Sequence, residues 1–216
     1  MAGMPSSAAP IAGLVLAAGG GSRYGMPKAL ARGDDGTPWL VRTIGTLTDA
    51  GCAPVIVVLG AQAAEARALL DEFGLTGAGG PSPQVVVTQA DDWAEGLSAS
   101  LRAGLRRAAL LPSAPIAVAI VPVDVPGLRT STVARLIGTL PDGAHTGAQH
   151  VGPHTLRQAS FDERPGHPVV IGRAHWAALI SSATGDTGAR PYLRTHDPRL
   201  VDCTDLETGL DVDTRD

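Results

Sequence analysis

The chain has 216 residues, of which 44% are hydrophobic and 18% are charged, with a formal net charge of −4. This length and composition are typical of a folded globular domain and exclude an intrinsically disordered chain. No run of Lys and Arg provides the basic surface that nucleic acid requires, so the sequence excludes DNA and RNA as partners.

The sequence also gives no sign of secretion or membrane insertion. Residues 1–10 lack a basic segment before an apolar stretch, and no apolar run approaches the roughly 20 residues that cross a bilayer. We therefore expect a cytoplasmic protein with no membrane partner. Cys52 and Cys203 lack the spacing of a metal site or a redox motif, which favours reduced structural thiols.

Short aliphatic runs alternate with helical patterns over the first 140 residues. The expected strands are Ala12–Leu16, Val55–Leu59, Gln84–Thr88 and Ile116–Val123. One helix is expected to begin with Thr37 as its cap and Pro38 as its first residue, and a second is expected to span Ala63–Phe73. A third helix carries Leu97, Leu101 and Leu105 at helical spacing, with Ser98 as its cap, and a fourth carries Val133 to Leu140. This alternation predicts a three-layer α/β/α, Rossmann-like fold with a mostly parallel sheet.

The pattern loosens after Pro141. There we expect strands at His154–Phe161 and His167–Ile171, a helix at Ala174–Ser182 and an edge strand within Leu200–Asp205. No linker or internal repeat divides the chain, so residues 1–216 are expected to form a single domain.

A Gly-rich loop follows the first expected strand, in the segment LAAGGGSRYGMPKAL of Leu16–Leu30. Gly tolerates positive φ, so backbone N–H groups of such a loop can point at phosphate oxygens, and Arg23 and Lys28 add positive charge. The dinucleotide fingerprint GxGxxG fails at Tyr24, and the P-loop fails because Lys28 follows Gly25 by three residues. The sequence therefore predicts a polyphosphate-binding loop of another type.

Two acidic segments are candidate metal ligands. Asp124 stands at the carboxyl end of the strand Ile116–Val123, where ligands of open α/β sheets gather, and a carboxylate there can bind Mg²⁺ together with phosphate oxygens. The tail GLDVDT adds Asp211 and Asp213. The structural alternatives are a turn residue at Asp124 and a solvated acidic tail.

The spacing LxxGxxxRxGxxK resembles the signature loop of the nucleotidyltransferases with the molybdenum cofactor transferase-like fold. The resemblance implies that Arg23 and Lys28 hold the phosphates of a nucleoside triphosphate and are catalytic together with Asp124. It also implies that Asp124, in Asp124-Val125-Pro126, and Asp213 bind Mg²⁺, with Asp211 as the alternate. The implied nucleotide loop, in which the backbone of Ala17, Ala18 and Gly19 faces the base, consists of Leu16, Ala17, Ala18, Gly19, Gly20, Gly21 and Ser22.

The tail departs from this family, because Arg215-Asp216 stand where the family commonly continues with Pro-Glu-Asp. This departure weakens the assignment of the second metal ligand.

The segment EGLSASLRAGL of Glu95–Leu105 resembles the corresponding region of the molybdenum cofactor cytidylyltransferases, as does the LAAG that opens the glycine loop. This resemblance implies CTP rather than GTP, with Gly96 allowing close backbone approach and Ser98 bonding a pyrimidine edge. A capped helix with an apolar face explains the same residues without a ligand.

Two later segments, Gly166-His167-Pro168 and GDTGAR of Gly185–Arg190, resemble acceptor-side segments of the same subfamily. We therefore expect His167, Asp186 and Arg190 to bind an anionic acceptor, with Asp186 or Thr187 capping a helix. An ordinary capped helix with a surface Arg and a strand-initiating His is the alternative. His145, His150 and His154 have no standard zinc-site spacing and are expected to be solvated.

Together these features predict an enzyme that transfers CMP from CTP, with Mg²⁺, to the terminal phosphate of molybdopterin and releases pyrophosphate. That phosphate is ionised near neutral pH, so no general base is expected. GTP in place of CTP, or a sugar or polyol phosphate as acceptor, remains open. The non-enzymatic alternative is a nucleotide- or cofactor-binding maturation factor that contacts a molybdoenzyme transiently.

Overall fold

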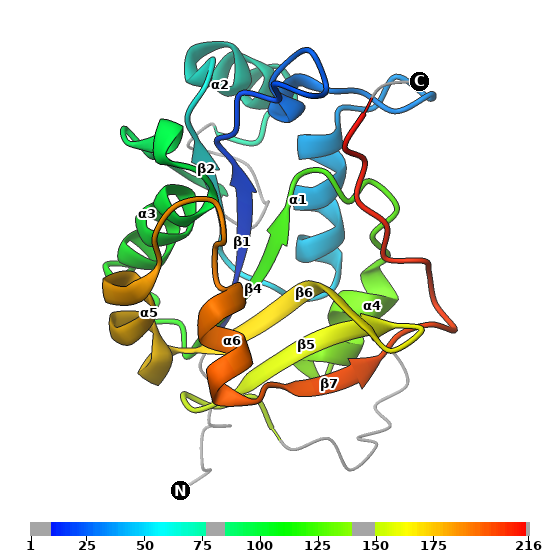
Figure 1. The fold of residues 1–216 in the computed structure, drawn as a ribbon. Helices are drawn as coiled ribbons and strands as arrows, with labels where there is room; N and C mark the ends of the chain where they lie inside the picture. The colour runs from blue at the N-terminus through cyan, green and yellow to red at the C-terminus, as the bar shows by residue number, and fades with distance from the viewer. Residues whose placement is uncertain (1–9, 77–84, 140–149, 215–216) are drawn as a thin grey trace, which may run out of the picture.

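The computed structural model describes residues 10–76, 85–139 and 150–214, and in them a seven-stranded sheet carries helices on both faces (Figure 1). The strands are β1 (Ile11–Ala17), β2 (Val55–Leu59), β3 (Val85–Gln89), β4 (Ala117–Pro122), β5 (Leu156–Phe161), β6 (Arg164–Gly172) and β7 (Arg199–Asp202). The helices are α1 (Trp39–Asp49), α2 (Ala63–Glu72), α3 (Leu97–Ala109), α4 (Thr130–Ile137), α5 (Trp176–Ser182) and α6 (Arg190–His196). Short 3₁₀ helices are η1 (Lys28–Leu30), η2 (Trp93–Glu95) and η3 (Arg173–His175).

The strand order is β3-β2-β1-β4-β6-β5-β7. The first four strands in this order are mutually parallel, β6 runs antiparallel to β4 and β5, and β7 is parallel to β5 at the sheet edge. The sheet is thus mixed but mostly parallel, and the predicted α/β fold class is confirmed. The edge strand expected within Leu200–Asp205 is present as β7.

Continuous aliphatic strands are explained by burial on both faces of the sheet. All five residues of β2 are buried. Val57 belongs to the same buried cluster as Leu40 of α1 on one face, and Ile56 belongs to the cluster of Leu101 of α3 on the other. Burying each such side chain stabilises the fold by about 1.5–3 kcal/mol, so these two layers fix the central strands whose ends carry the candidate site.

Two helix starts differ from the sequence expectation. The N-cap of α1 is Pro38, without a side-chain cap, because Thr37 belongs to the preceding turn, where its N–H donates to Asp35 Oδ1 at 3.0 Å. The N-cap of α3 is Gly96, so Ser98 lies inside the helix and does not cap it.

Most expected element boundaries agree with the structure to within a few residues. One difference is β6, which begins at Arg164 rather than at His167 because the turn of Asp162 and Glu163 pairs it with β5. Gln84, Leu140, His145 and Arg215-Asp216 lie outside the described residues. Within the described part, no helix combines the length and apolar character of a membrane-spanning segment.

Candidate functional site

The glycine loop leaves the carboxyl end of β1 and returns to η1. Gly19 and Gly20 are exposed, whereas the side chains of Leu16, Ala17 and Ala18 are buried beneath them. Gly21 has φ +62°, and a Cβ at this position would collide with the carbonyl oxygen of Met26. The run of Gly therefore permits a tight loop that a bulkier residue at position 21 would break.

Four charged side chains meet beside this loop, and we call Arg23, Lys28, Asp124 and Asp213 the charged cluster. Lys28 Nζ donates to Asp124 Oδ2 at 2.8 Å and to Asp213 Oδ1 at 3.1 Å. Arg23 Nη1 donates to Asp213 Oδ2 at 3.4 Å. Lys28 and Asp124 are 96 positions apart in sequence, so the fold brings together the cations and carboxylates singled out from the sequence.

Strand pairing explains why the loop and Asp124 meet. β1 and β4 are parallel neighbours, with Leu16 opposite Pro122, and the Val123 N–H donates to the Leu16 carbonyl at 3.1 Å. The segments that follow β1 and β4 therefore leave the sheet side by side, at the carboxyl ends of the two strands. The tail is held there by the Val212 N–H, which donates to the Asp124 carbonyl at 2.9 Å.

The cluster is partly shielded from water at its centre. The Lys28 and Asp124 side chains are 16% and 21% exposed, whereas Asp213 is 54% exposed. Burial lowers the pKa of Lys28, but its hydrogen bonds and charge interactions with Asp124 and Asp213 outweigh this effect, so the pKa lies above its ordinary value. The hydrogen bond and charge of Lys28 lower the pKa of Asp213. Both groups are therefore charged at neutral pH.

The expected base-side and acceptor-side segments bind each other. The Leu97 N–H donates to Asp186 Oδ1 at 3.0 Å, and the Ser98 N–H donates to the Gly185 carbonyl at 3.1 Å. In return, the Gly188 N–H donates to Ser98 Oγ at 3.1 Å. Gly96 has φ +112°, and a Cβ there would lie 2.9 Å from Asp186 Cα. Residues 96–98 and 185–188 thus form one hydrogen-bonded unit.

This unit corrects the expected role of Asp186 as the cap of a local helix. The N-cap of α6 is Ala189, with no side-chain cap, while Asp186 caps the distant start of α3 through Leu97. Thr187 Oγ1 donates to the Thr184 carbonyl at 3.2 Å and does not cap a helix either. Ser98 is fully buried by this packing.

We expect Asp186→Ala to lower the free energy of unfolding by about 1 kcal/mol, because the first backbone N–H of α3 loses its acceptor. Asp186→Asn retains an acceptor oxygen and should lose less. Urea denaturation of both variants measures the difference. Equal losses would show that the Leu97 hydrogen bond contributes nothing specific.

Sequence analysis missed Arg102, which ties the same unit to its surroundings. Its Nη2 donates to Asp92 Oδ2 and to Glu95 Oε2, both at 2.6 Å, and its Nη1 donates to the Ala183 carbonyl at 3.0 Å. The available signal was a lone cation within the mostly apolar stretch LSASLRAGL. Trp93 was also missed, although its ring lies 3.3 Å from the position of a Cβ on Gly20.

His167 lies near Asp124 of the charged cluster, and Arg190 lies near His167. Burial lowers the pKa of His167, while the nearby charges of Asp124 and Asp211 raise it and that of Arg190 lowers it. The structure therefore places these groups in one electrostatic neighbourhood, with His167 neutral at pH 7 and Arg190 exposed.

The lowered pKa of His167 predicts a pH dependence of stability. Below about pH 6.5 the His167 side chain binds a proton in the unfolded chain more readily than in the folded protein. The folded state is therefore most stable above that pH and loses stability as the pH falls. We expect the free energy of unfolding to drop between pH 7.5 and pH 5.5 more steeply for the wild type than for His167→Asn. Urea titrations at both pH values measure this, and parallel losses would contradict it.

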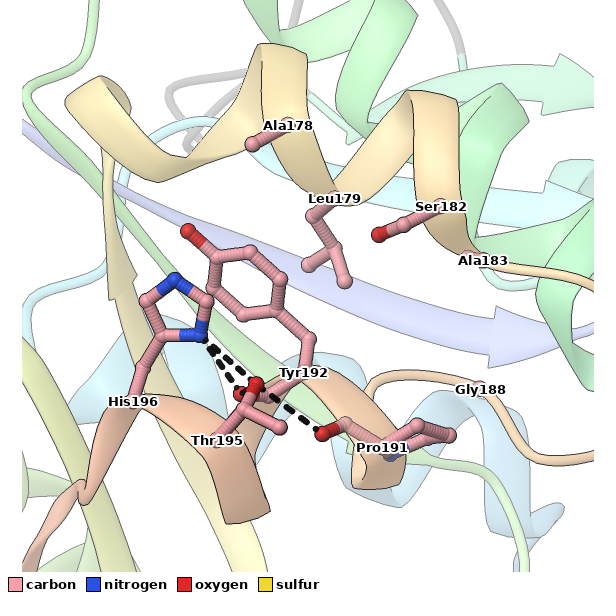
Figure 2. A pocket seen from close by; sticks show the side chains of 9 residues that line it. All are labelled: Ala178, Leu179, Ser182, Ala183, Gly188, Pro191, Tyr192, Thr195 and His196. Atoms are coloured by element: carbon pink, nitrogen blue, oxygen red, sulfur yellow. Dashed lines mark hydrogen bonds between the residues drawn. The ribbon is translucent and has the colours of Figure 1, made fainter.

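Two cavities lie apart from the charged cluster. Figure 2 shows the first, of about 370 Å³, between α5 and α6, where the stacked rings of Tyr192 and His196 form one wall. The second, of about 540 Å³, is lined by His150 and His154, both exposed, near the start of β5. Within the described residues, no group of three or more His, Cys, Asp or Glu side chains is placed to hold a metal ion.

The chain is similar to known proteins in both sequence and fold. Residues 13–200 match the model of the MobA-like NTP transferase domain. The chain is 37% identical over 217 residues to nicotine blue oxidoreductase of Paenarthrobacter nicotinovorans, which covers 94% of this chain and 92% of that protein.

Solved structures agree with this match. The structure of Rv0371c from Mycobacterium tuberculosis has a TM-score of 0.67 at 27% identity and covers 95% of this chain and 94% of that one. A complex of the same protein with manganese has a TM-score of 0.60 at 26% identity, covering 89% and 86%. A nucleotidyl transferase from Methanothermobacter has a TM-score of 0.71 at 21% identity, covering 95% and 92%, and shows likeness of fold. The chain belongs to the MobA-like NTP transferase family.

Proposed function

We propose that this chain is a cytidylyltransferase that moves CMP from CTP to the terminal phosphate of a small molecule, with molybdopterin as the acceptor. One observation carries the proposal: the glycine loop, its two cations and two carboxylates from distant segments converge at one edge of the sheet. A triphosphate with its metal ion needs this combination of backbone donors, cations and carboxylates. Family membership supports the nucleotidyl transfer, and the choice of CTP and molybdopterin rests on the sequence resemblance.

The residues present fit a divalent cation. Asp124 and Asp213 direct one oxygen each at the same ammonium group, so their carboxylates also converge closely enough to share a small hard cation. We assign them as the ligands of Mg²⁺, which when bound neutralises developing charge on the phosphates. The manganese complex of Rv0371c shows that a relative takes up a divalent ion.

In the proposed reaction an oxygen of the acceptor phosphate attacks the α-phosphorus of CTP, and the bond to pyrophosphate breaks. Arg23 and Lys28 hold the phosphates and offset the charge of the leaving group. The ionised acceptor phosphate is itself the nucleophile, so the mechanism uses no general base. Catalysis then rests on alignment and charge, which the rigid ends of β1 and β4 provide.

We assign the base to the backbone of Ala17, Ala18 and Gly19 and to the backbone at Gly96, and the phosphates to the glycine loop that follows. Ser98 acts in this scheme by holding Gly188, since its Oγ accepts a hydrogen bond there and the residue is buried. We assign the acceptor to His167, which lies within electrostatic reach of Asp124, and to Arg190, which lies within reach of His167. Asp186 shapes this region through Leu97.

The test is pyrophosphate release from each of the four nucleoside triphosphates with Mg²⁺ and a phosphorylated acceptor, followed by mass analysis of the product. We expect CTP and molybdopterin to give the highest rate. Preference for GTP, or for a sugar or polyol phosphate, would change the substrate and keep the chemistry. Tight nucleotide binding without pyrophosphate release would favour a maturation factor.

The match to nicotine blue oxidoreductase supports a second candidate, a redox reaction at the same site. The charged cluster has no redox-active side chain, so the electrons would come from a bound donor such as a nicotinamide dinucleotide. Loss of absorbance at 340 nm upon addition of nicotine blue, without pyrophosphate release, would favour this candidate.

A further inference from the structure

We infer that Lys28 and Arg23 act as internal counter-ions that block the metal site until a triphosphate arrives, so that metal and nucleotide bind together. This inference rests on the proposed function and concerns the regulation of the same site. In the free protein the two cations pair with the carboxylates, whereas with substrate they bind its phosphates.

In the charged cluster, Lys28 and Arg23 contact most of the carboxylate oxygens that a metal ion would need. Three of the four carboxylate oxygens of Asp124 and Asp213 face a cation, at 2.8, 3.1 and 3.4 Å. An oxygen that accepts a hydrogen bond from an ammonium group offers little to a metal ion, and the ammonium itself repels the ion at this range. Metal binding to the free protein must therefore displace Lys28.

Displacing Lys28 is unfavourable without another anion. Its side chain is 16% exposed, so it would leave a partly shielded place between two carboxylates. The cluster consists of two cations and two carboxylates and is neutral as a whole, so a lone divalent ion meets no net attraction from it.

A triphosphate changes this balance. Its negative charges offer Lys28 and Arg23 new partners and free the carboxylate oxygens for the ion. Because thermodynamic coupling between two ligands is reciprocal, the metal then strengthens nucleotide binding by the same factor. Lys28 exchanges carboxylates for phosphates during this step.

Replacing Lys28 with Met removes the charge and retains most of the chain length. We expect K28M to bind Mn²⁺ alone about 10-fold more tightly than the wild type, as measured by electron paramagnetic resonance of free Mn²⁺. R23M should shift the affinity in the same direction but less, because Arg23 is 74% exposed and more distant from Asp213. R106M is the matched control, since it removes an exposed cation of α3 and should leave Mn²⁺ affinity unchanged.

The same titration is repeated with a non-hydrolysable CTP analogue that carries a methylene group between the α- and β-phosphorus. We expect the analogue to tighten Mn²⁺ binding to the wild type by about 10-fold beyond the affinity of the analogue itself for the ion. Circular dichroism checks that each variant is folded. If K28M does not fold, the Mn²⁺ affinity of R23M is the measurement that tests the counter-ion role.

The outcomes separate the inference from the proposed function. Mn²⁺ affinity that is unchanged or weaker in both K28M and R23M overturns the counter-ion role, whether or not the protein transfers nucleotides. Tighter Mn²⁺ binding by K28M supports the counter-ion role. A CTP analogue that binds the wild type without tightening its Mn²⁺ binding overturns the coupling of metal and nucleotide. If no nucleoside triphosphate binds at all, both this coupling and the proposed reaction fail.

Discussion

Replacing Lys28 with Ala is expected to lower the rate of nucleotidyl transfer by about two to three orders of magnitude while the protein folds normally. Loss of one preorganised charge contact in a shielded site costs about 3–4 kcal/mol of transition-state stabilisation by analogy with oxyanion sites. Lys28 is the cation in contact with both candidate metal ligands, so its loss affects phosphate binding and carboxylate positioning together. Pyrophosphate release at saturating CTP and Mg²⁺ measures the effect.

The matched control for this variant is Arg135→Ala. Arg135 also forms an ion pair with a carboxylate, Asp205, but on α4, outside the charged cluster. We expect this variant to retain wild-type turnover, even if it is somewhat less stable. Wild-type turnover by folded Lys28→Ala would remove Lys28 from the catalytic assignment and leave Arg23 as the phosphate-binding cation.

The central part of the fold could be predicted because local signals agree with tertiary structure there. The strand Val55–Leu59 has the predicted bounds, since a continuous β-branched run suits a strand buried on both faces. The meeting of Lys28 with Asp124 was also predictable. Parallel neighbouring strands end at one edge of the sheet, which brings the residues that follow them together.

The unit of residues 96–98 and 185–188 could not be predicted in the same way. Its contacts join residues 89 and 90 positions apart and depend on how α3 and the segment before α6 are placed. Local patterns favoured Ser98 and Asp186 as caps of their own helices. The fold uses both for long-range contacts instead, because tertiary hydrogen bonds outweigh a local capping preference of about 1 kcal/mol.

Asp124→Asn is the second substitution expected to have a large effect. It keeps the size of the side chain but removes the charge, so the proposed site loses one of its two anionic metal ligands. We expect the rate to fall by about two to three orders of magnitude. The Mg²⁺ concentration needed for half-maximal activity should rise, which initial rates measured over a series of Mg²⁺ concentrations would show.

A comparison within the tail completes this test. Asp213 contacts Lys28 and Arg23 directly, whereas Asp211 acts on His167 from a distance. Asp213→Asn should therefore share the raised Mg²⁺ requirement of Asp124→Asn, and Asp211→Asn should raise it less. If Asp211→Asn has the larger effect, the tail presents the other carboxylate to the metal. If all three variants keep the wild-type Mg²⁺ requirement, the metal is held elsewhere, and the proposed reaction loses its structural basis at this edge of the sheet.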